Sequence, residues 1–423
     1  EIKGKGPVGK FFSEDSLKDI MKIYNAKIGD SIFLACGKEK DVEKILSLAR
    51  DKIAQAINRE GRGGLDDFIA LVSPLASLEY MEPMARLSHS LTEKRFGKAM
   101  RLFAPLYLSN ECNNICDYCG FSLGNKIIRK TLNEAEILRE AGLLKKMGFS
   151  HVLLVTGEST KKVGLDYINK SIRTLRPYFS NLSIEVQPLH QEEYEILKTS
   201  GLHSVLVYQE TYNQNSYARH HIKGKKANFE WRLGTPDRLG NAGVHKIGLG
   251  CLFGLTKDWR TDAFFAAHHM DYLQKKYWKT QYSMSFPRLR PCTGEISPEI
   301  TLNDRDLVQL ICAFRIFNHE LEISISTRES SDLRNHLLPL GVTTMSAGSK
   351  TNPGGYGNDD SLEQFEISDE RSVSEVSSYL KSAGYDVVWK DWDISYDNQH
   401  SSSLIKKNSV NRKQSLVSEV IKH

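Results

Sequence analysis

The chain has 423 residues, of which 40% are hydrophobic and 26% charged, and this composition excludes collagen-like, fully disordered and small disulfide-stabilised proteins. Its formal charge of +5 arises from 57 basic and 52 acidic residues, a mild excess that implies no nucleic-acid partner. We find no apolar run long enough to span a membrane and no apolar signal-peptide core at the start, so we expect a cytoplasmic protein without a membrane partner.

The predicted elements begin with helices. Residues 1–100 carry apolar side chains at helical spacing, which predicts an N-terminal helical extension. Further along, runs typical of strands alternate with runs typical of helices. The predicted strands cover 103–110, 151–157, 182–188, 203–210, 245–255, 280–286, 322–327 and 341–346. Helical patterns over 132–148, 192–201 and 303–317 lie between them, with Asn133 and Asn303 as expected N-caps.

Eight buried strands separated by helices predict an α/β fold, a TIM-type (β/α)8 barrel, which we assign to residues 101–350. A C-terminal cap region follows over 351–395, and 396–423 form a polar basic tail that we expect to be mobile or a lone surface helix. Barrel enzymes place their chemistry at the carboxyl ends of the strands. We therefore look for site residues where the predicted strands end.

Three of the seven cysteines stand close together directly after the first predicted strand. Cys112, Cys116 and Cys119 form a CxxxCxxC motif in the segment SNECNNICDYCGFS. Thiolates are soft ligands for zinc, copper(I) and iron–sulfur clusters. Three thiolates hold three irons of a [4Fe-4S] cube and leave the fourth iron open, whereas electron carriers normally fill all four positions with cysteine. The motif therefore favours a catalytic iron–sulfur cluster.

The residues alone leave two alternatives open. One is a zinc site completed by a distant His220 or His221, although zinc motifs usually pair two short ligand halves and the sequence has no clear second half. The other is a non-catalytic iron–sulfur or zinc protein whose barrel only binds a partner. The remaining cysteines lie in strand or helix contexts and are predicted to be buried small apolar residues. They are Cys36, Cys251, Cys292 and Cys312.

The motif also lies within a longer series of motifs. From about residue 68 to 393 the chain carries, in order, PLYLSNECNNICDYCGFS, LLVTGE, YQETY, WRLGTPDR, KIGLG, SFPRLRPCTG and STRES. This order resembles the radical S-adenosylmethionine (SAM) superfamily and, more narrowly, the 2-iminoacetate synthase family, the tyrosine lyases of thiamine biosynthesis. The resemblance implies a [4Fe-4S] cluster on the three cysteines and SAM as its co-substrate. It also implies a 5′-deoxyadenosyl radical that splits L-tyrosine between Cα and Cβ into 2-iminoacetate and p-cresol.

The resemblance further implies contacts with SAM. Glu158 would meet the methionine ammonium, Arg232 the methionine carboxylate and Glu210 the ribose hydroxyls. Thr156 stands where glycine is commoner in the family, which weakens that motif without removing its glutamate. Gly250 either lets the adenine lie against the strand or serves barrel packing. The implied cofactor-binding residues are Gly157, Glu158, Glu210, Arg232 and Gly250.

For the substrate, the resemblance points to arginines and hydroxyls at two further strand ends. Arg288 and Arg290 follow the sixth predicted strand, and Ser326 ends the seventh, in STRES. We predict that Arg290 and Ser326 bind the amino-acid head group, with Arg288 as a further candidate. Tyr107, inside the first strand, either lines the same cavity or is a barrel-core aromatic. In the basic stretch 219–226, Arg219 is a weak candidate for an anionic ligand.

Two protein partners follow from the resemblance, which are thiazole synthase as the recipient of iminoacetate and a reductant such as flavodoxin or ferredoxin. A tryptophan-cleaving relative remains an alternative because it differs in cavity shape. The hydrogenase-cofactor maturase that cleaves tyrosine carries a second cluster on C-terminal cysteines. No cysteine follows Cys312 here, which argues against that branch.

Overall fold

The computed structural model describes residues 39–292, 302–357 and 362–389. The predicted tail, 396–423, and the first part of the predicted N-terminal extension, 1–38, lie outside the described residues, as does Cys36. Within the described ranges, no helix is long and apolar enough to cross a membrane.

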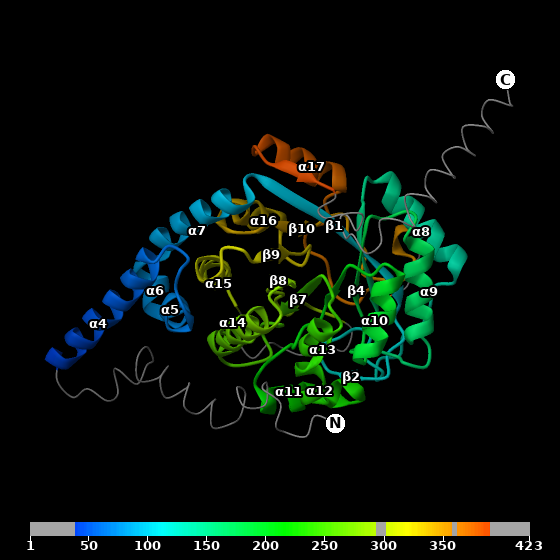
Figure 1. Cartoon of the computed structure of the whole chain (residues 1–423), viewed down its shortest axis with the longest axis horizontal. Coiled ribbons are helices and arrows are strands. Elements are labelled where there is room, and N and C mark those ends of the chain that lie inside the picture. The colour runs from blue at the N-terminus through cyan, green and yellow to red at the C-terminus, as the bar shows by residue number, and fades with distance from the viewer. Residues whose placement is uncertain (1–38, 293–301, 358–361, 390–423) are drawn as a thin grey trace.

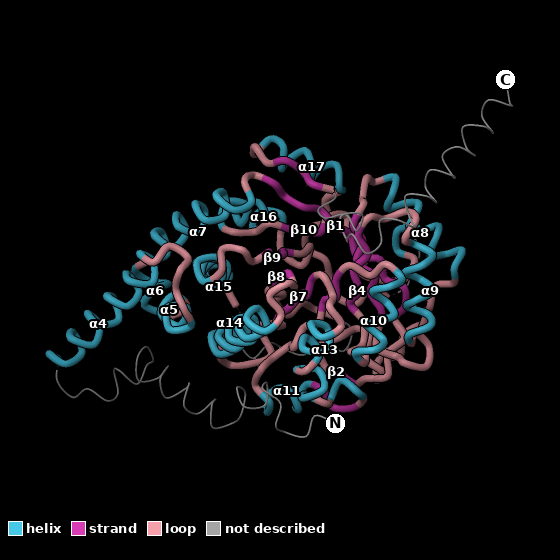
Figure 2. The backbone as a smooth tube through the Cα atoms, in the orientation of Figure 1, coloured by secondary structure: helices cyan, strands magenta, loops and turns pink. Residues whose placement is uncertain are grey.

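Eight parallel strands close into a barrel at the centre of the molecule (Figures 1 and 2). Each predicted strand is confirmed, and the ring is completed where β10 pairs with β1, with Arg101 opposite Thr344. In ring order the strands are β1 (Ala99–Ser109), β3 (His151–Thr156), β4 (Asn181–Glu185), β5 (Ser204–Leu206), β7 (Lys246–Gly250), β8 (Gln281–Ser285), β9 (Glu322–Ile325) and β10 (Thr344–Ser346). The predicted (β/α)8 fold is therefore confirmed.

Helices follow the strands and surround the ring. They are α8 (Glu134–Lys146), α9 (Leu165–Leu175), α10 (Gln191–Ser200), α11 (Gln214–His220), α12 (Phe229–Leu233), α13 (Thr235–Asn241), α14 (Trp259–Lys276), α15 (Asp304–Phe317) and α16 (Ser331–Leu337). Both predicted N-caps are confirmed, because the side chains of Asn133 and Asn303 accept hydrogen bonds from the first turns of α8 and α15.

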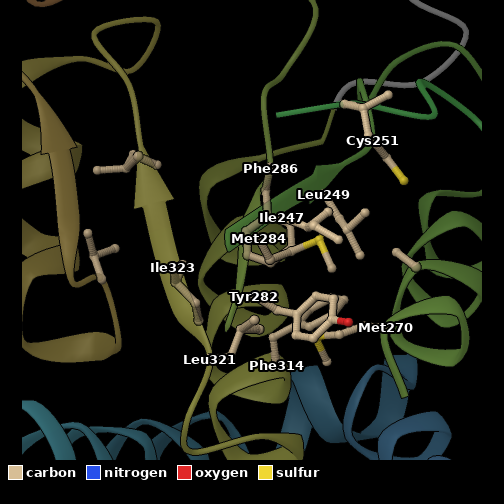
Figure 3. Packing of buried hydrophobic residues seen from close by; sticks show 14 of the residues in the cluster. Ile247, Leu249, Cys251, Met270, Tyr282, Met284, Phe286, Phe314, Leu321 and Ile323 are labelled. Carbon is tan, nitrogen blue, oxygen red and sulfur yellow. The ribbon is translucent and has the colours of Figure 1, made fainter. Parts of the chain in front are cut away.

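Alternate residues of each strand point outward and form the main core. On β7 and β8 these include Ile247, Leu249, Tyr282 and Met284, which pack with Met270 of α14 (Figure 3). Because the side chains of a strand alternate, the residues between them point into the barrel. The outer positions of these strands are large and apolar, which suits packing against the surrounding helices.

The inward positions of several strands are unusually small. They include Ser183, Gly248, Ser285 and Ser324, where barrels more often carry bulky branched side chains. The small residues leave space inside the upper part of the barrel. That space becomes a cavity at the carboxyl ends of the strands.

The opposite end of the barrel is filled by an ionic layer of Arg101, Lys246 and Glu322. Glu322 accepts from Lys246 Nζ at 2.6 Å and from the Arg101 guanidinium, which also donates to Thr344 Oγ1 at 3.0 Å. A second cavity lies below this layer, and among the described residues none lines both cavities. The layer therefore separates the upper cavity from the lower face.

The described N-terminal helices pack on the barrel's outer side (Figure 1). They are α4 (Glu39–Asn58), α5 (Leu65–Leu71), α6 (Pro74–Glu79) and α7 (Met81–Phe96), so the helical prediction is confirmed for this part. Phe68 of α5 packs edge-on against Phe314 and Phe317 of α15. At the other end of the chain, α17 (Val373–Ser382) leads into β11 (Asp386–Val388), which pairs with the start of β1. The exact domain boundaries stay a prediction.

Candidate active site

The upper cavity lies where the sequence predicts the chemistry, at the carboxyl ends of the strands. Its wall combines residues from strands β1, β3, β4, β5, β8, β9 and β10 with loop residues and with a segment near residue 364. The polar and aromatic residues that line it include Tyr107, Cys112, Asn114, Cys116, Tyr118, Cys119, Phe121, Glu158, Glu185, Tyr208, Glu210, Lys226, Arg232, Ser285, Ser326, Arg328, Gln364 and Phe365.

The three predicted cluster cysteines share one wall of this cavity. Cys116 ends the short strand β2 (Ile115–Cys116), which pairs with β6 (His221–Lys223) and brings the basic stretch beside the loop. Arg129 holds the same loop from behind, because its guanidinium donates to the carbonyls of Asn110 and Phe121 at 2.6 and 2.8 Å. The loop is thus fixed on both sides.

The chemistry of the thiols fits an iron–sulfur cluster. Burial raises the pKa values of Cys112 and Cys116, and the nearby Glu158 and Cys119 side chains raise them further. Three adjacent thiols that are hard to ionise together need a cationic centre to become thiolates. Among the described cysteines, no fourth one lines the cavity. A [4Fe-4S] cluster bound here would keep one iron open to SAM.

The structure does not bring the two alternative zinc ligands to the cysteines. His220 bonds through Nδ1 to Asp117 and through Nε2 to the carbonyl of Leu255. His221 bonds to the Tyr118 hydroxyl and to a backbone carbonyl, so its two ring nitrogens are engaged as well. Within the described ranges, no three His, Cys, Asp or Glu side chains converge as ligands of a single ion. The ring positions therefore argue against the zinc alternative.

The other cysteines differ in part from the prediction. Cys251 and Cys312 are buried, as expected. Cys292 is only half-buried, and its thiol donates to the carbonyl of Tyr118 at 3.2 Å. Its position after the end of β8 brings it beside the cluster loop, outside the cavity wall, so the prediction of a buried apolar residue is wrong for this position.

Gly157 is required by a close approach of two loops. Its amide donates to the carbonyl of Ser109 at 2.9 Å, which ties the end of β3 to the end of β1. A Cβ atom at this position would lie 2.4 Å from the carbonyl oxygen of Glu111, next to Cys112. Only glycine fits without moving the cluster loop.

Four charged side chains form a buried network between the ends of β3 and β5. Arg232 of α12 donates to Glu158 at 2.9 Å, and Lys226 donates to Glu210 at 2.7 Å. Burial raises the pKa values of both carboxyls, but Arg232 and Lys226 outweigh it and hold both below their ordinary values. Glu210 has a positive φ of 70°, so its backbone is held in a conformation that disfavours ordinary side chains. The three predicted SAM contacts Glu158, Glu210 and Arg232 are thus brought together, and the side chain of Arg232 is buried.

Gly250 does not line the cavity. A Cβ atom there would lie 2.7 Å from the Tyr208 ring and from the carbonyl oxygen of Ser285. The glycine therefore makes room for Tyr208, which does line the cavity. This placement favours packing over adenine contact.

Arg288 and Arg290 are not among the residues that line the cavity, although Leu289 between them is. The buried carboxylate of Glu329 takes up both: Arg288 binds it at 3.0 Å through Nε, and Arg290 lies 3.7 Å away. Arg288 also binds Asp304 at 2.8 Å. Both arginines brace the ends of β8 and β9, and a role for them in substrate binding stays a prediction. Arg328 lines the cavity in their place.

The half-buried Arg328 faces the cavity from the end of β9, and its guanidinium makes no hydrogen bond or ion pair with any described residue. Its guanidinium carbon lies 3.4 Å from the centre of the Phe365 ring, which holds the side chain in place. Ser326, also on the wall, accepts from the Arg328 amide at 3.3 Å.

Tyr107 lines the cavity from inside β1, as one of the two alternatives expected. Its hydroxyl donates to Gln364 Oε1 at 2.7 Å. Gln364 Nε2 in turn donates to Cys119 Sγ at 3.7 Å. Arg219 does not reach the wall, and it binds Ser216 at 3.3 Å on α11.

Five wall residues were missed from the sequence. Lys226 lies in the basic stretch 219–226, and Arg328 stands in STRES at the end of the seventh predicted strand, so both lie in segments that the sequence singles out. Glu185 also ends a predicted strand. Tyr208 begins the quoted YQETY motif, whereas Gln364 lies in no motif that was quoted. The missed residues are Glu185, Tyr208, Lys226, Arg328 and Gln364.

A closed parallel barrel with a three-cysteine loop after its first strand, beside charged residues suited to an amino-acid head group, defines a radical SAM enzyme. The Radical SAM superfamily model matches residues 106–266, and the Biotin and Thiamin Synthesis associated domain matches residues 285–386. This superfamily uses a [4Fe-4S] cluster and SAM.

The chain belongs to the 2-iminoacetate synthase family. It is similar to the 2-iminoacetate synthase of Escherichia coli (strain K12), with 53% identity over 340 residues that cover 80% of this chain and 90% of that protein. The solved structure of the FeFe-hydrogenase maturase HydG from Carboxydothermus hydrogenoformans is similar with a TM-score of 0.79 and 29% identity, covering 92% of this chain and 86% of that chain. A short match, 70% identical over 54 residues, is to the aspartate–tRNA(Asp/Asn) ligase of Pelagibacter ubique and covers 13% of this chain and 9% of that protein.

Proposed function

We propose that this chain splits L-tyrosine between Cα and Cβ into 2-iminoacetate and p-cresol. The observation that carries the proposal is one cavity that joins three cluster cysteines to Arg328, a cation with no carboxylate partner among the described residues. An unpaired guanidinium in such a site suits the carboxylate of an amino acid. The 53% identity to the E. coli synthase supports tyrosine as that amino acid.

When bound, the cluster on Cys112, Cys116 and Cys119 and SAM supply a radical that removes a hydrogen atom from the tyrosine amino group, after which the Cα–Cβ bond breaks. The chain's own part is to bind, orient and shield. Glu158 and Arg232 are an ion pair 2.9 Å apart, and the methionine end of SAM carries the complementary ammonium and carboxylate. Glu158 and Arg232 keep each other ionised, so each side chain is able to bind the oppositely charged group of SAM.

Glu210 and Lys226 act at the ribose end. Glu210 stays ionised near neutral pH, because its neighbours lower its pKa, and it accepts hydrogen bonds from the hydroxyls. Lys226 balances this charge. Arg328 binds the tyrosine carboxylate, and Ser326 lies beside it. Tyr107 and Tyr208 supply aromatic walls for the substrate ring.

The product 2-iminoacetate hydrolyses readily in water, which favours direct transfer to a thiazole synthase. The reaction needs one electron per turnover, and flavodoxin or ferredoxin is the proposed donor. Both proposals, and a cytoplasmic location, follow from the family and from the reaction chemistry.

The test is product analysis under anaerobic conditions. Reconstituted protein with SAM, a reductant and tyrosine is expected to release p-cresol and 5′-deoxyadenosine, and tryptophan in place of tyrosine is expected to release no aromatic fragment. Absence of p-cresol from protein with a verified cluster and bound SAM would contradict the proposal. Faster cleavage of tryptophan would instead assign the chain to the tryptophan-cleaving branch.

A further inference from the structure

Glu185 is a cavity carboxyl for which neither the cluster nor SAM accounts. It ends β4, and it shares the inward face of that strand with Ser183, which bonds to Ser204 inside the barrel. It lines the upper cavity. Its carboxylate makes no hydrogen bond or ion pair with any residue in the described ranges.

Arg328 faces Glu185 across the cavity. Strand β4 stands four places from β9 around the ring, whether counted through β5, β7 and β8 or through β3, β1 and β10. The two side chains therefore approach from opposite walls, and no ion pair joins them. An eight-stranded barrel leaves room for a single small ligand between such walls.

The other charged groups nearby are already paired. The groups that influence Glu185 are Tyr107 on β1, Tyr208 and Glu210 after β5, Arg328 after β9, and Lys226 and Arg232 from the loop and helix beyond. Lys226 and Arg232 are paired with Glu210 and Glu158. Among the described residues, the cavity thus presents one unpaired cation, Arg328, opposite one unpaired carboxyl, Glu185.

Glu185 is also able to exchange a proton near neutral pH. Burial raises its pKa to about 7, and repulsion from Glu210 adds to this, while Arg328, Lys226 and Arg232 act in the opposite direction. A carboxyl with a pKa in this range both takes up and releases a proton at the working pH of most enzymes. A bound cation would draw it into the ionised form.

We propose that Glu185 binds the amino group of the substrate and takes one proton from it, while Arg328 holds the substrate carboxylate. This inference rests on the proposed function. The amino acid head group is a zwitterion, and its two charges match the two facing side chains in sign. In the step, an N–H bond of the ammonium breaks with its electron pair left on nitrogen, and an O–H bond forms on Glu185.

This proton transfer prepares the amino group for the radical step. Neutral amine nitrogen has a lone pair that stabilises the radical left after loss of a hydrogen atom, whereas ammonium nitrogen has none. Glu185 lies on the strand between β3 and β5, whose ends carry Glu158 and Glu210. The amino group is therefore held on the side where SAM is proposed to bind.

A binding cycle without reductant tests the contact apart from turnover. Holoenzyme with SAM is titrated with tyrosine and with 3-(4-hydroxyphenyl)propionate, which lacks only the amino group. Glu185→Gln is expected to weaken the binding of tyrosine about tenfold or more, which is the effect of losing a hydrogen bond between charged groups. The affinity for the analogue is expected to stay unchanged. An equal loss of affinity for both ligands would overturn the proposal, because it would place the shared phenol at Glu185. An unchanged affinity for tyrosine would overturn it as well.

Two further variants serve as controls for this binding experiment. Glu140→Gln changes a buried carboxyl outside the cavity, which accepts from the Tyr356 amide at 3.0 Å, and is expected to alter neither affinity. Glu185→Asp keeps a carboxylate and is expected to retain part of the amino-dependent affinity even if Glu185→Gln binds iron poorly. An aspartate variant that binds tyrosine no better than the analogue would count against the role.

The pH dependence of turnover tests the proton transfer. In wild type, p-cresol formation at saturating tyrosine is expected to level off above neutral pH. Glu185→Gln must lose the amino proton to solvent, so its rate is expected to keep rising into the range where α-amino groups titrate. Identical profiles would refute the transfer. If wild type makes no p-cresol but the binding cycle holds, the proposed reaction fails and the amino-group contact stands.

Discussion

At the residue scale, opposite charges decide what the cavity accepts, and the sequence located only some of them. The cluster cysteines and Glu158 stand within short motifs beside strand ends, where local pattern suffices. The choice between Arg290 and Arg328 could not be made from the sequence, because both follow predicted strands. Tertiary contacts favour Arg328, because the buried carboxylate of Glu329 pairs with Arg288 and Arg290 while Arg328 lines the cavity. Such competition depends on tertiary contacts.

Replacing Arg328 is expected to affect the substrate selectively. Arg328→Gln should raise the KM for tyrosine roughly 10- to 100-fold, since a hydrogen bond to a charged group contributes about 1.5–3 kcal/mol. SAM binding should be unchanged. Steady-state p-cresol assays measure the effect. Arg290→Gln, the matched control, should lower the free energy of unfolding and change KM little, and an equal rise in its KM would contradict the assignment.

At the scale of elements, the cluster loop is held by parts of the chain that no local pattern connects. The amide of Gly120 donates to the carbonyl of Gln364 at 3.2 Å, and the end of β3 presses on the loop at Gly157. The position of the loop after β1 was predictable from strand order. Its contact with a segment more than 200 residues away was not, because long-range docking leaves no periodic signal.

Gly157→Ala is expected to displace the cluster loop. The added methyl would meet the Glu111 carbonyl at 2.4 Å, so the loop must move away from β3 and the cysteines with it. Iron and sulfide content after anaerobic reconstitution should fall well below wild type. Gly124→Ala is the control, since a Cβ there meets nothing within 4 Å. Full iron loading of Gly157→Ala would show that the loop tolerates the shift.

At the scale of the whole molecule, the barrel was predictable because each of its strands carries its own hydrophobic run. The hollow interior was harder to foresee, since the inward residues stand out as small only after the alternation of each strand is known. The docking of β11 on β1 was also not predictable, because a three-residue strand has too little pattern. The N-terminal helices form part of the same core, through Phe68 between Phe314 and Phe317.

The N-terminal helices are therefore expected to contribute to global stability. Phe68 is fully buried, and Phe68→Ala should lower the free energy of unfolding by about 3–5 kcal/mol, the usual effect of such a truncation. Denaturant titration followed by circular dichroism measures it. Leu78→Ala on α6, where the side chain is 75% exposed, should have little effect. A separate early transition for Phe68→Ala would show that these helices unfold independently.

The ionic layer of Arg101, Lys246 and Glu322 blocks the amino-terminal end of the barrel below the upper cavity. Both fragments of a split amino acid must then leave from the carboxyl ends of the strands. The fragment that lies nearer the opening of the cavity must then leave before the fragment that lies deeper. The order of product release therefore determines how long the water-sensitive imine stays in the cavity. A protein that receives the imine would best dock at the opening of the cavity.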